Sequence, residues 1–437
     1  MPAHSADPRR VDQQRADQQR VRRWSIAVIA VFAVLGFGFG TWLSRLPAVR
    51  DHLGATTLEM SVYGLSMGIG SLVGLAFSGR AVAWFGARRT LLVCLAMQAV
   101  AMVATINVFW AEQLAGGMAL LFSYGFFFSI SDVAANVSGA EAERAVGRPR
   151  MPIFHGCYSL GAVATMGIGA AAEAAHIAAP VHVSVVIVLA AIAGLIALRW
   201  IPRDHAVGAV LAAAPPEAPG SVITGPIPTL PRAASAAAPA AGKPLREYSP
   251  WRDPRIYLVG LIALSMSLAE GTGSDWISLA LVDGRGFSNS LATLGVGVFF
   301  AAMVTTRFAG TFLLERFGRV TMIRASAALC ALGLAALILI PVPWVAVLGI
   351  AMWGGGCALG FPVGISAAAD DPATAVRSVA AVSMIAYGAF LVGPPMIGFL
   401  GEHFGLLPAF WPVAVCALAC VAIAGATRRR GDETAAA

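Results

Sequence analysis

An acidic residue, Asp132, stands inside an apolar run of the sequence, in the segment 126–136 (FFFSISDVAAN). The run is long enough to cross a bilayer, where an ionised carboxylate costs about 3 kcal/mol, so we expect this side chain to face protein or water. Four residues recur at intervals of four and share one face of a helix: Tyr124, Phe128, Asp132 and Asn136. On this face the Asp132 carboxylate would take up a proton when its surroundings exclude water, and it would release the proton when water enters. The alternative is an interfacial carboxylate that pairs with Arg144 or Arg148.

A second acid, Glu270, lies close to the centre of another apolar segment. Gly271 and Gly273 follow it, so we expect the helix to unwind easily at this point. Interrupted helices in the middle of a membrane are where solute sites are commonly built, which favours a functional role for Glu270. The alternative is a buried structural ion pair with an arginine such as Arg307.

Other polar or aromatic residues accompany these acids. His155 and Ser159 share one helix face, and His155 is either a proton relay or a packing residue. Asp275 and Trp276 lie further out than Glu270, and Trp276 is either a platform for a solute or part of the aromatic belt at the interface. Arg45 follows the first apolar segment, where it would hold an outer gate or a solute carboxylate, or extend to the interface.

Composition places these residues in a membrane protein. The chain is 58% hydrophobic and 12% charged, with a mean hydropathy of +0.76, which no ordinary soluble domain reaches. The net charge of +7 comes from arginines beside apolar segments, so it indicates membrane topology rather than nucleic-acid binding. We predict twelve membrane helices, near residues 24–43, 57–79, 90–110, 113–137, 152–173, 180–201, 256–281, 290–314, 321–340, 343–368, 378–400 and 406–426.

An Ala- and Pro-rich stretch between the sixth and seventh predicted helices divides the chain in two. The predicted organisation is a polar N-terminal tail, a first six-helix bundle, a flexible linker, a second six-helix bundle and a C-terminal tail, at residues 1–23, 24–201, 202–253, 254–426 and 427–437. Arginines gather on the side of the termini and the linker, which places that side in the cytoplasm of a bacterial inner membrane. The prolines of Phe361–Pro362 and Pro394–Pro395 predict kinks within their helices.

Sequence features typical of enzymes are missing. There is no Walker loop, because the glycines at 354–356 have neither the lysine nor the preceding strand that such a loop needs. There is no nucleophile elbow, no metal-ligand spacing and no disulfide framework among the six cysteines, all of which fall in apolar segments. We therefore expect no enzyme activity, no cofactor and no bound metal.

The loop after the second predicted helix reads GRAVAWFGARR, and the loop after the eighth reads GTFLLERFGR. Glycine-bounded turns that end in arginine, at matching positions of two halves, indicate an internal repeat and two pseudo-symmetric bundles. The arginines of these turns can bind helix carboxyl ends or a neighbouring carboxylate and so form a cytoplasmic latch that opens and closes. The residues of this latch would be Arg88, Arg89, Glu315, Arg316 and Arg319.

These loops resemble the G-x-x-x-D-R-x-G-R-R signature of the major facilitator superfamily, and the resemblance covers nearly the whole chain. The first copy departs from the signature, since Ala83 stands in place of the acidic residue and Trp84 in place of the basic one. The segment 132–136 (DVAAN) is similar to the ETAAN stretch of the fucose–proton symporters, where the acid belongs to the proton and sugar site. The segments FHGCYSLG (154–161) and EGTGSDW (270–276) resemble bacterial transporters close to the fucose permeases. The carboxylate that the sugar symporters carry in their first helix is absent here.

This resemblance implies an all-α membrane protein with twelve transmembrane helices that works by alternating access, usually as a monomer. The expected function is proton-coupled symport of a small polar solute. Asp132 or Glu270 would carry the proton, and five residues would shape the cavity: Tyr124, Asn136, His155, Ser159 and Trp276. Two alternatives stay open, namely a proton-driven exporter of amphipathic compounds and a membrane sensor or scaffold that does not transport. The expected partners are the solute, the proton and the lipid bilayer.

Overall fold

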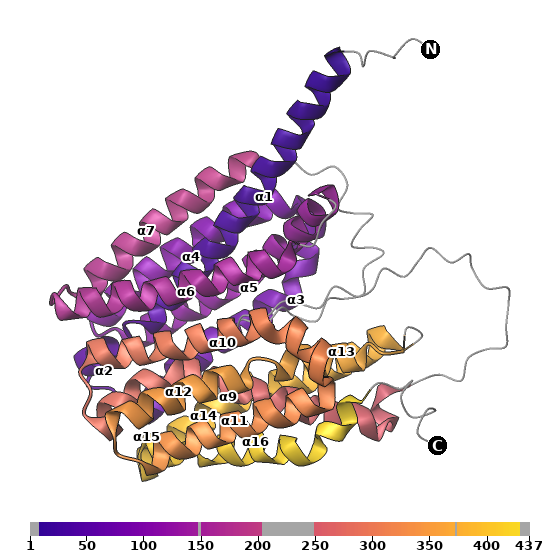
Figure 1. Cartoon of the computed structure of the whole chain (residues 1–437). Coiled ribbons are helices and arrows are strands. Elements are labelled where there is room, and N and C mark those ends of the chain that lie inside the picture. The colour runs from indigo at the N-terminus through magenta and orange to yellow at the C-terminus, as the bar shows by residue number, and fades with distance from the viewer. Residues whose placement is uncertain (1–7, 147–149, 203–248, 372–373, 429–437) are drawn as a thin grey trace, which may run out of the picture.

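The computed structural model describes residues 8–146, 150–202, 249–371 and 374–428, and every regular element within these residues is a helix (Figure 1). Twelve of the segments are long and apolar enough to cross a membrane, which confirms the predicted number of spans. The chain is therefore an all-α membrane protein. The predicted linker lies outside the described residues except at its two ends.

The first half of the chain forms one bundle, coloured indigo to pink in Figure 1. Its helices are α1 (Pro8–Leu43), α2 (Leu46–Leu53), α3 (Thr57–Phe85), α4 (Ala87–Trp110), α5 (Leu114–Val146), α6 (Met151–Ala174), α7 (Ala179–Ala197) and the 3-10 turn η1 (Leu198–Trp200). Helix α1 starts within the predicted polar tail, so its first turns continue the first span beyond the bundle (Figure 1).

The second half forms the other bundle, coloured red to yellow. Its helices are η2 (Pro250–Arg252), α9 (Pro254–Arg285), α10 (Asn289–Phe317), α11 (Arg319–Leu339), α12 (Pro343–Cys357), α13 (Gly360–Ala368), α14 (Ala375–Phe404), α15 (Leu406–Ala409), α16 (Trp411–Ile423) and η3 (Ala424–Thr427). The two halves meet where α6 packs on α10 and where α3 packs on α14 (Figure 1).

The backbone repeats itself at the two arginine loops. Gly86 joins α3 to α4 with φ 77° and ψ 157°, and Gly318 joins α10 to α11 with φ 76° and ψ 163°. Only glycine adopts this conformation without steric cost, so each loop needs its glycine at this position. The matching geometry supports the internal repeat inferred from the sequence.

Glycines also allow helices in the first half to touch. A Cβ atom on Gly70 would lie 2.0 Å from the carbonyl oxygen of Phe122, and one on Gly74 would lie 2.2 Å from that of Phe126. Gly36 meets the carbonyl of Tyr158 in the same way, at 2.0 Å. These contacts lock α3 against α5 and α1 against α6.

The expectation that the helix unwinds after Glu270 is wrong, because α9 is a continuous helix from Pro254 to Arg285. Gly273 serves packing instead, since a Cβ atom there would come within 2.5 Å of the ring of Phe299. The tenth predicted span is interrupted instead: α12 ends at Cys357 and α13 begins at Gly360. Helix α14 continues through Pro394 and Pro395.

Candidate functional site

The polar stripe of α5 is buried between helices. Tyr124, Asp132 and Asn136 are exposed by 1%, 8% and 5%. The Asn136 amide donates to the Asp132 carbonyl oxygen at 2.9 Å and to its carboxylate at 3.3 Å. Among the described residues, neither the Tyr124 hydroxyl nor the side-chain oxygen of Asn136 has a hydrogen-bond partner. The stripe therefore brings polar groups into the protein interior with hydrogen-bonding capacity to spare.

Glu270 of α9 forms a buried ion pair with Arg307 of α10, which was the alternative interpretation of this residue. One guanidinium nitrogen of Arg307 lies 3.0 and 2.9 Å from the two carboxylate oxygens, and the side chains are exposed by only 8% and 5%. Charge-assisted bonds of this kind compensate much of the cost of burying both charges.

A second bond explains why Arg307 stays in place. Its Nε atom donates to the carbonyl oxygen of Ala358 at 3.2 Å, in the turn between α12 and α13. Pro362 has no N–H group to reach back four residues to this carbonyl, so the break in the tenth span leaves the oxygen without its helical donor. Arg307 supplies the missing donor and is thereby fixed beside Glu270.

Tyr158 of α6, which no sequence pattern singled out, interacts with the acids of both halves. Its hydroxyl interacts electrostatically with Asp132 in the first half and with Glu270 and Arg307 in the second. The His155 ring lies one turn away, packs edge-on against Phe32 at 5.0 Å and also interacts with Arg307. Its Nε2 atom is buried without a hydrogen-bond partner among the described residues. These side chains form a polar junction between the halves.

Two other predicted site residues are Ser159 and Trp276. The Ser159 hydroxyl donates to the carbonyl of His155 at 3.2 Å, so it is satisfied within its own helix. Trp276 is exposed by only 3%, which excludes a place in an aromatic belt facing lipid.

A pocket lies between the halves, where α1 and α3 face α9 and α14, and we call it the inter-half pocket. The space between its walls, open solvent included, is about 600 Å³. It is lined by Phe39, Gly64, Met67, Gly68, Ser71, Leu72, Leu75, Asp275, Tyr387, Phe390 and Pro394.

Two of these lining residues, Asp275 and Tyr387, carry the polar character of the pocket. The carboxylate of half-buried Asp275 accepts a hydrogen bond from the neighbouring Ser274 hydroxyl at 3.2 Å. The Tyr387 hydroxyl interacts electrostatically with Asp132 of the opposite half. From the sequence, Asp275 was placed only as lying further out than Glu270, and Tyr387 was not selected, because the interaction of Tyr387 with Asp132 depends on how the bundles dock.

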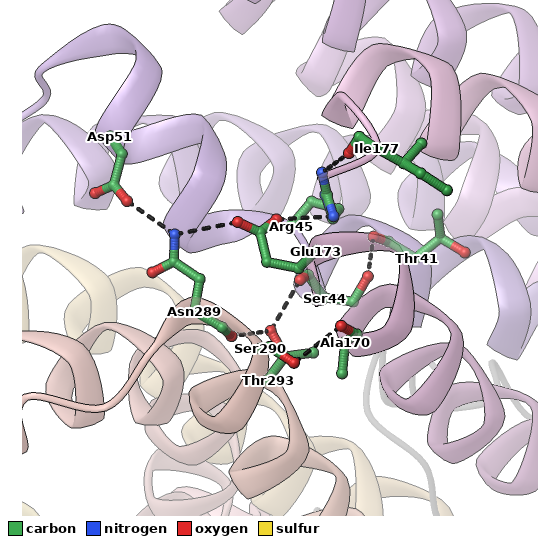
Figure 2. A network of polar contacts seen from close by, with 10 residues as sticks. All are labelled: Thr41, Ser44, Arg45, Asp51, Ala170, Glu173, Ile177, Asn289, Ser290 and Thr293. Atoms are coloured by element: carbon green, nitrogen blue, oxygen red, sulfur yellow. Dashed lines mark hydrogen bonds and ion pairs between the residues drawn. The ribbon is translucent and has the colours of Figure 1, made fainter. Parts of the chain in front are cut away.

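The end of the molecule that carries Arg45 is closed by polar contacts (Figure 2). Arg45 is exposed by 2%, forms an ion pair with Glu173 at 2.8 Å and donates to the carbonyl of Ile177 at 2.6 Å. It therefore does not extend to the membrane interface. Glu173 and Ile177 both belong to the first half, and Glu173 in turn accepts a hydrogen bond from Asn289 of the second half.

Residues at the start of α10 complete the closure from the second half (Figure 2). The Asn289 amide donates to Asp51 at 2.9 Å and to Glu173 at 3.5 Å. The hydroxyls of Ser290 and Thr293 donate to the carbonyls of Ala170 at 2.9 Å and Ser44 at 3.0 Å. We call the whole network the Arg45-end clasp.

Two further contacts join the halves at this end. Glu402 of α14 accepts hydrogen bonds from the backbone N–H groups of Thr57 at 3.0 Å and Leu58 at 3.4 Å. A carboxylate is stabilised at such a helix N-terminus, so Glu402 ties α14 to α3. Arg50 of α2 binds Asp283 of α9.

The residues of the predicted latch lie at the opposite end. Arg319 binds Asp370 at 2.6 Å and Ser366 at 2.8 Å, and Arg255 binds the same carboxylate at 2.8 Å. This cluster lies within the second half. The remaining predicted latch residues begin α4 or end α10: Arg88 is half-buried, while Arg89, Glu315 and Arg316 are exposed. The Arg316 guanidinium lies 5.7 Å from the centre of the Phe317 ring.

Among the residues that the structure describes, no group of three His, Cys, Asp or Glu side chains gathers in a way that could hold a metal ion. The arrangement is instead a buried polar junction, a pocket beside it and a closed end, all at the boundary of two helical bundles.

Comparisons with known proteins agree with this architecture. Residues 28–391 match the family model described as Major Facilitator Superfamily. The chain is 32% identical over 398 residues to an uncharacterized transporter of Sinorhizobium fredii, covering 89% of this chain and 94% of the relative. It is 27% identical over 406 residues to an uncharacterized MFS-type transporter of Yersinia pestis, covering 91% and 94%.

Solved structures show the same fold. The nucleoside transporter NupG superposes with a TM-score of 0.68 at 16% identity, covering 92% of this chain and 98% of that one. A D-xylose-proton symporter gives 0.67 at 14% identity, covering 92% and 96%, and the transporter FucP gives 0.57 at 11%, covering 92% and 98%. The chain is therefore a multi-pass secondary transporter, not an enzyme, and it belongs to the Major Facilitator Superfamily.

Proposed function

We propose that the protein is a proton-coupled symporter of a small polar solute, and that the solute binds between the two halves. The observation that carries this proposal is the position of Tyr387. This residue lines the inter-half pocket and interacts with Asp132 of the opposite half, so a solute in the pocket and a proton on Asp132 would affect one another. The similarity of fold to a D-xylose-proton symporter supports the same proposal.

Asp132 is the better candidate for the proton carrier. Glu270 is bound to Arg307, and protonating it would leave a buried cation without its counter-charge. The Asp132 carboxylate receives a hydrogen bond from the neutral amide of Asn136. In our proposal Asp132 gains a proton while one side of the membrane is open to it, and loses the proton to the other side.

Buried polar groups at the junction favour a polar solute. The Tyr124 and Tyr387 hydroxyls, the Asn136 oxygen and the His155 Nε2 atom are all buried, and none has a hydrogen-bond partner in the described part of the chain. An unsatisfied buried group costs about 1–3 kcal/mol, so water or solute hydroxyls are the expected partners when the cavity opens.

In the proposed cycle the two ends open in turn. The arginine distribution assigns the termini to the cytoplasm, so the Arg45-end clasp would be the periplasmic gate of a bacterial inner-membrane protein. The loops with Arg88, Arg89, Glu315, Arg316 and Arg319 would form the cytoplasmic latch. In our proposal the protein works as a monomer, because one chain contains both halves and both gates.

One observation favours a second candidate, export of amphipathic compounds driven by the proton gradient. Most of the side chains that line the inter-half pocket are apolar, and Phe39, Phe390 and Tyr387 contribute aromatic rings. Such walls suit a solute with a sizeable apolar body. The direction of the proton relative to the solute separates this candidate from symport.

The test is solute-dependent proton movement in proteoliposomes. A thermal-shift screen of the purified protein against sugars, sugar acids and amino acids first identifies a ligand, because binding to the folded state raises the melting temperature. That ligand is then added outside vesicles that contain a pH-sensitive dye. Symport predicts that the lumen acidifies as the solute enters, whereas proton-driven export predicts opposite movement of the two. Absence of any solute-dependent proton movement would contradict both and favour a non-transporting sensor.

A further inference from the structure

Among the described residues that line the inter-half pocket, Asp275 is the only one with an ionisable acidic or basic group of the Asp, Glu, Lys or Arg type. We propose that this pocket selects an organic cation, with a protonated amine beside Asp275 and an apolar body against the aromatic wall. The inference rests on the proposed function in one respect, namely that the inter-half pocket is where the solute binds. It holds for either direction of transport.

The partners of the Asp275 carboxylate support this proposal. Its hydrogen-bond partner is the neutral Ser274 hydroxyl, and no arginine, lysine or histidine of the described segments forms an ion pair with it. Other carboxylates in the structure have such a partner: Glu270 binds Arg307, and Asp370 binds Arg255 and Arg319. A half-buried carboxylate without a protein cation leaves a place for a cation from the solute.

Aromatic side chains that line the same pocket as Asp275 also support an organic cation. Phe39 comes from α1, and the rings of Tyr387 and Phe390 on α14 stack with centres 6.2 Å apart. Aromatic faces attract ammonium groups and bury apolar surface, so such a wall suits a cation with a carbon body.

Other classes of solute fit the pocket less well. An anion would be repelled by Asp275. A sugar would need many hydrogen-bond partners, yet the Ser71 hydroxyl already donates to the carbonyl of Gly125 at 3.2 Å. The Tyr387 hydroxyl is buried and has no partner within the described residues, so it is available to an amine or to one hydroxyl of the solute. The pocket thus offers few polar contacts and a single acidic side chain.

Equilibrium binding to the purified full-length protein tests the charge preference directly. Three probes of similar size share a phenyl ring and differ in charge: phenethylamine as the cation, phenethyl alcohol as the neutral analogue and phenylpropionate as the anion. We expect phenethylamine to bind about tenfold more tightly than the alcohol, because only the amine can form a charge-assisted hydrogen bond with the Asp275 carboxylate. We expect no binding of phenylpropionate.

Variants of Asp275 assign the preference to this residue. Asp275→Asn keeps the shape of the side chain and removes its charge. The affinity for phenethylamine should therefore fall to that for the alcohol, while the affinity for the alcohol stays unchanged. Asp275→Glu retains the charge and should retain the preference for the amine. Equal binding of the three probes, a preference that survives in Asp275→Asn, or no amine binding at about 10 mM would each overturn the proposal.

The binding experiment and the test of proton coupling can fail independently of one another, because binding is measured without a proton gradient. If the amine preference is found and no solute moves protons, the pocket assignment stands and the coupling proposal falls. If a neutral solute drives proton movement and the amine preference is absent, the reverse holds. Glu112→Gln, in the exposed turn between α4 and α5, is the matched control and should change neither result.

Discussion

Arg307 of α10 donates to both carboxylate oxygens of Glu270 on α9, and both side chains are buried. Replacing one partner leaves the other charge buried and uncompensated, which costs about 3–5 kcal/mol. We therefore predict that Glu270→Gln and Arg307→Gln each lower the melting temperature of the purified protein strongly. The loss of stability in the double variant should be much smaller than the sum of the losses in the two single variants, because no buried charge is then left without its partner. Additive losses in the double variant would show that the pair does not act as a unit.

Asn289 joins the second half to Asp51 and Glu173 of the first. We predict that Asn289→Ala weakens the Arg45-end clasp and increases the time during which that end is open. The measurement is labelling of a Leu72→Cys variant, whose cysteine lines the inter-half pocket, by an impermeant maleimide added from the periplasmic side. The six native cysteines are replaced by serine beforehand.

Labelling should increase several-fold in Asn289→Ala. The matched control is Asn107→Ala, because among the described residues the Asn107 amide bonds within the first half, to Val103 at 2.7 Å and Ser184 at 3.3 Å. Unchanged labelling in Asn289→Ala, or an equal increase in Asn107→Ala, would remove Asn289 from the gate.

Gly70 and Gly64 stand on the same helix and differ in what a methyl group would meet. On Gly70 the methyl carbon would lie 2.0 Å from the Phe122 carbonyl oxygen, whereas on Gly64 it would have no atom of another helix within 4 Å. We predict that Gly70→Ala destabilises the protein by about 1–3 kcal/mol through overpacking. Gly64→Ala should stabilise it by about 0.5–1 kcal/mol, because alanine has the higher helix propensity. Thermal unfolding in detergent measures both variants, and equal melting temperatures would contradict the close approach of α3 and α5.

Hydropathy and local spacing were sufficient for much of the fold. The twelve spans follow from apolar runs of the right length, and the repeat follows from Gly86 and Gly318, whose backbone angles nearly coincide. The α5 stripe follows from four-residue spacing, since residues at that spacing lie on one face of any helix. These features depend on neighbours along the chain, which the sequence displays directly.

Features that depend on docking of helices were not predictable in this way. A glycine at position 273 is compatible with an unwound turn or with close helix packing. In the structure it allows close packing against the ring of Phe299. Pro362 predicts a break, but not that Arg307 replaces the missing donor to Ala358. The interaction of Tyr387 with Asp132 is between helices of opposite halves, and no local pattern in either helix predicts it.

The central claim is that Asp132 couples the solute to the proton, and its most direct test compares two modes of transport in proteoliposomes. In Asp132→Asn, a pH gradient should no longer drive accumulation of the solute, while exchange of labelled for unlabelled solute should continue at near wild-type rates. Glu112→Gln, a carboxylate change in an exposed turn, should leave both modes intact. Gradient-driven accumulation that persists unchanged in Asp132→Asn would contradict the account.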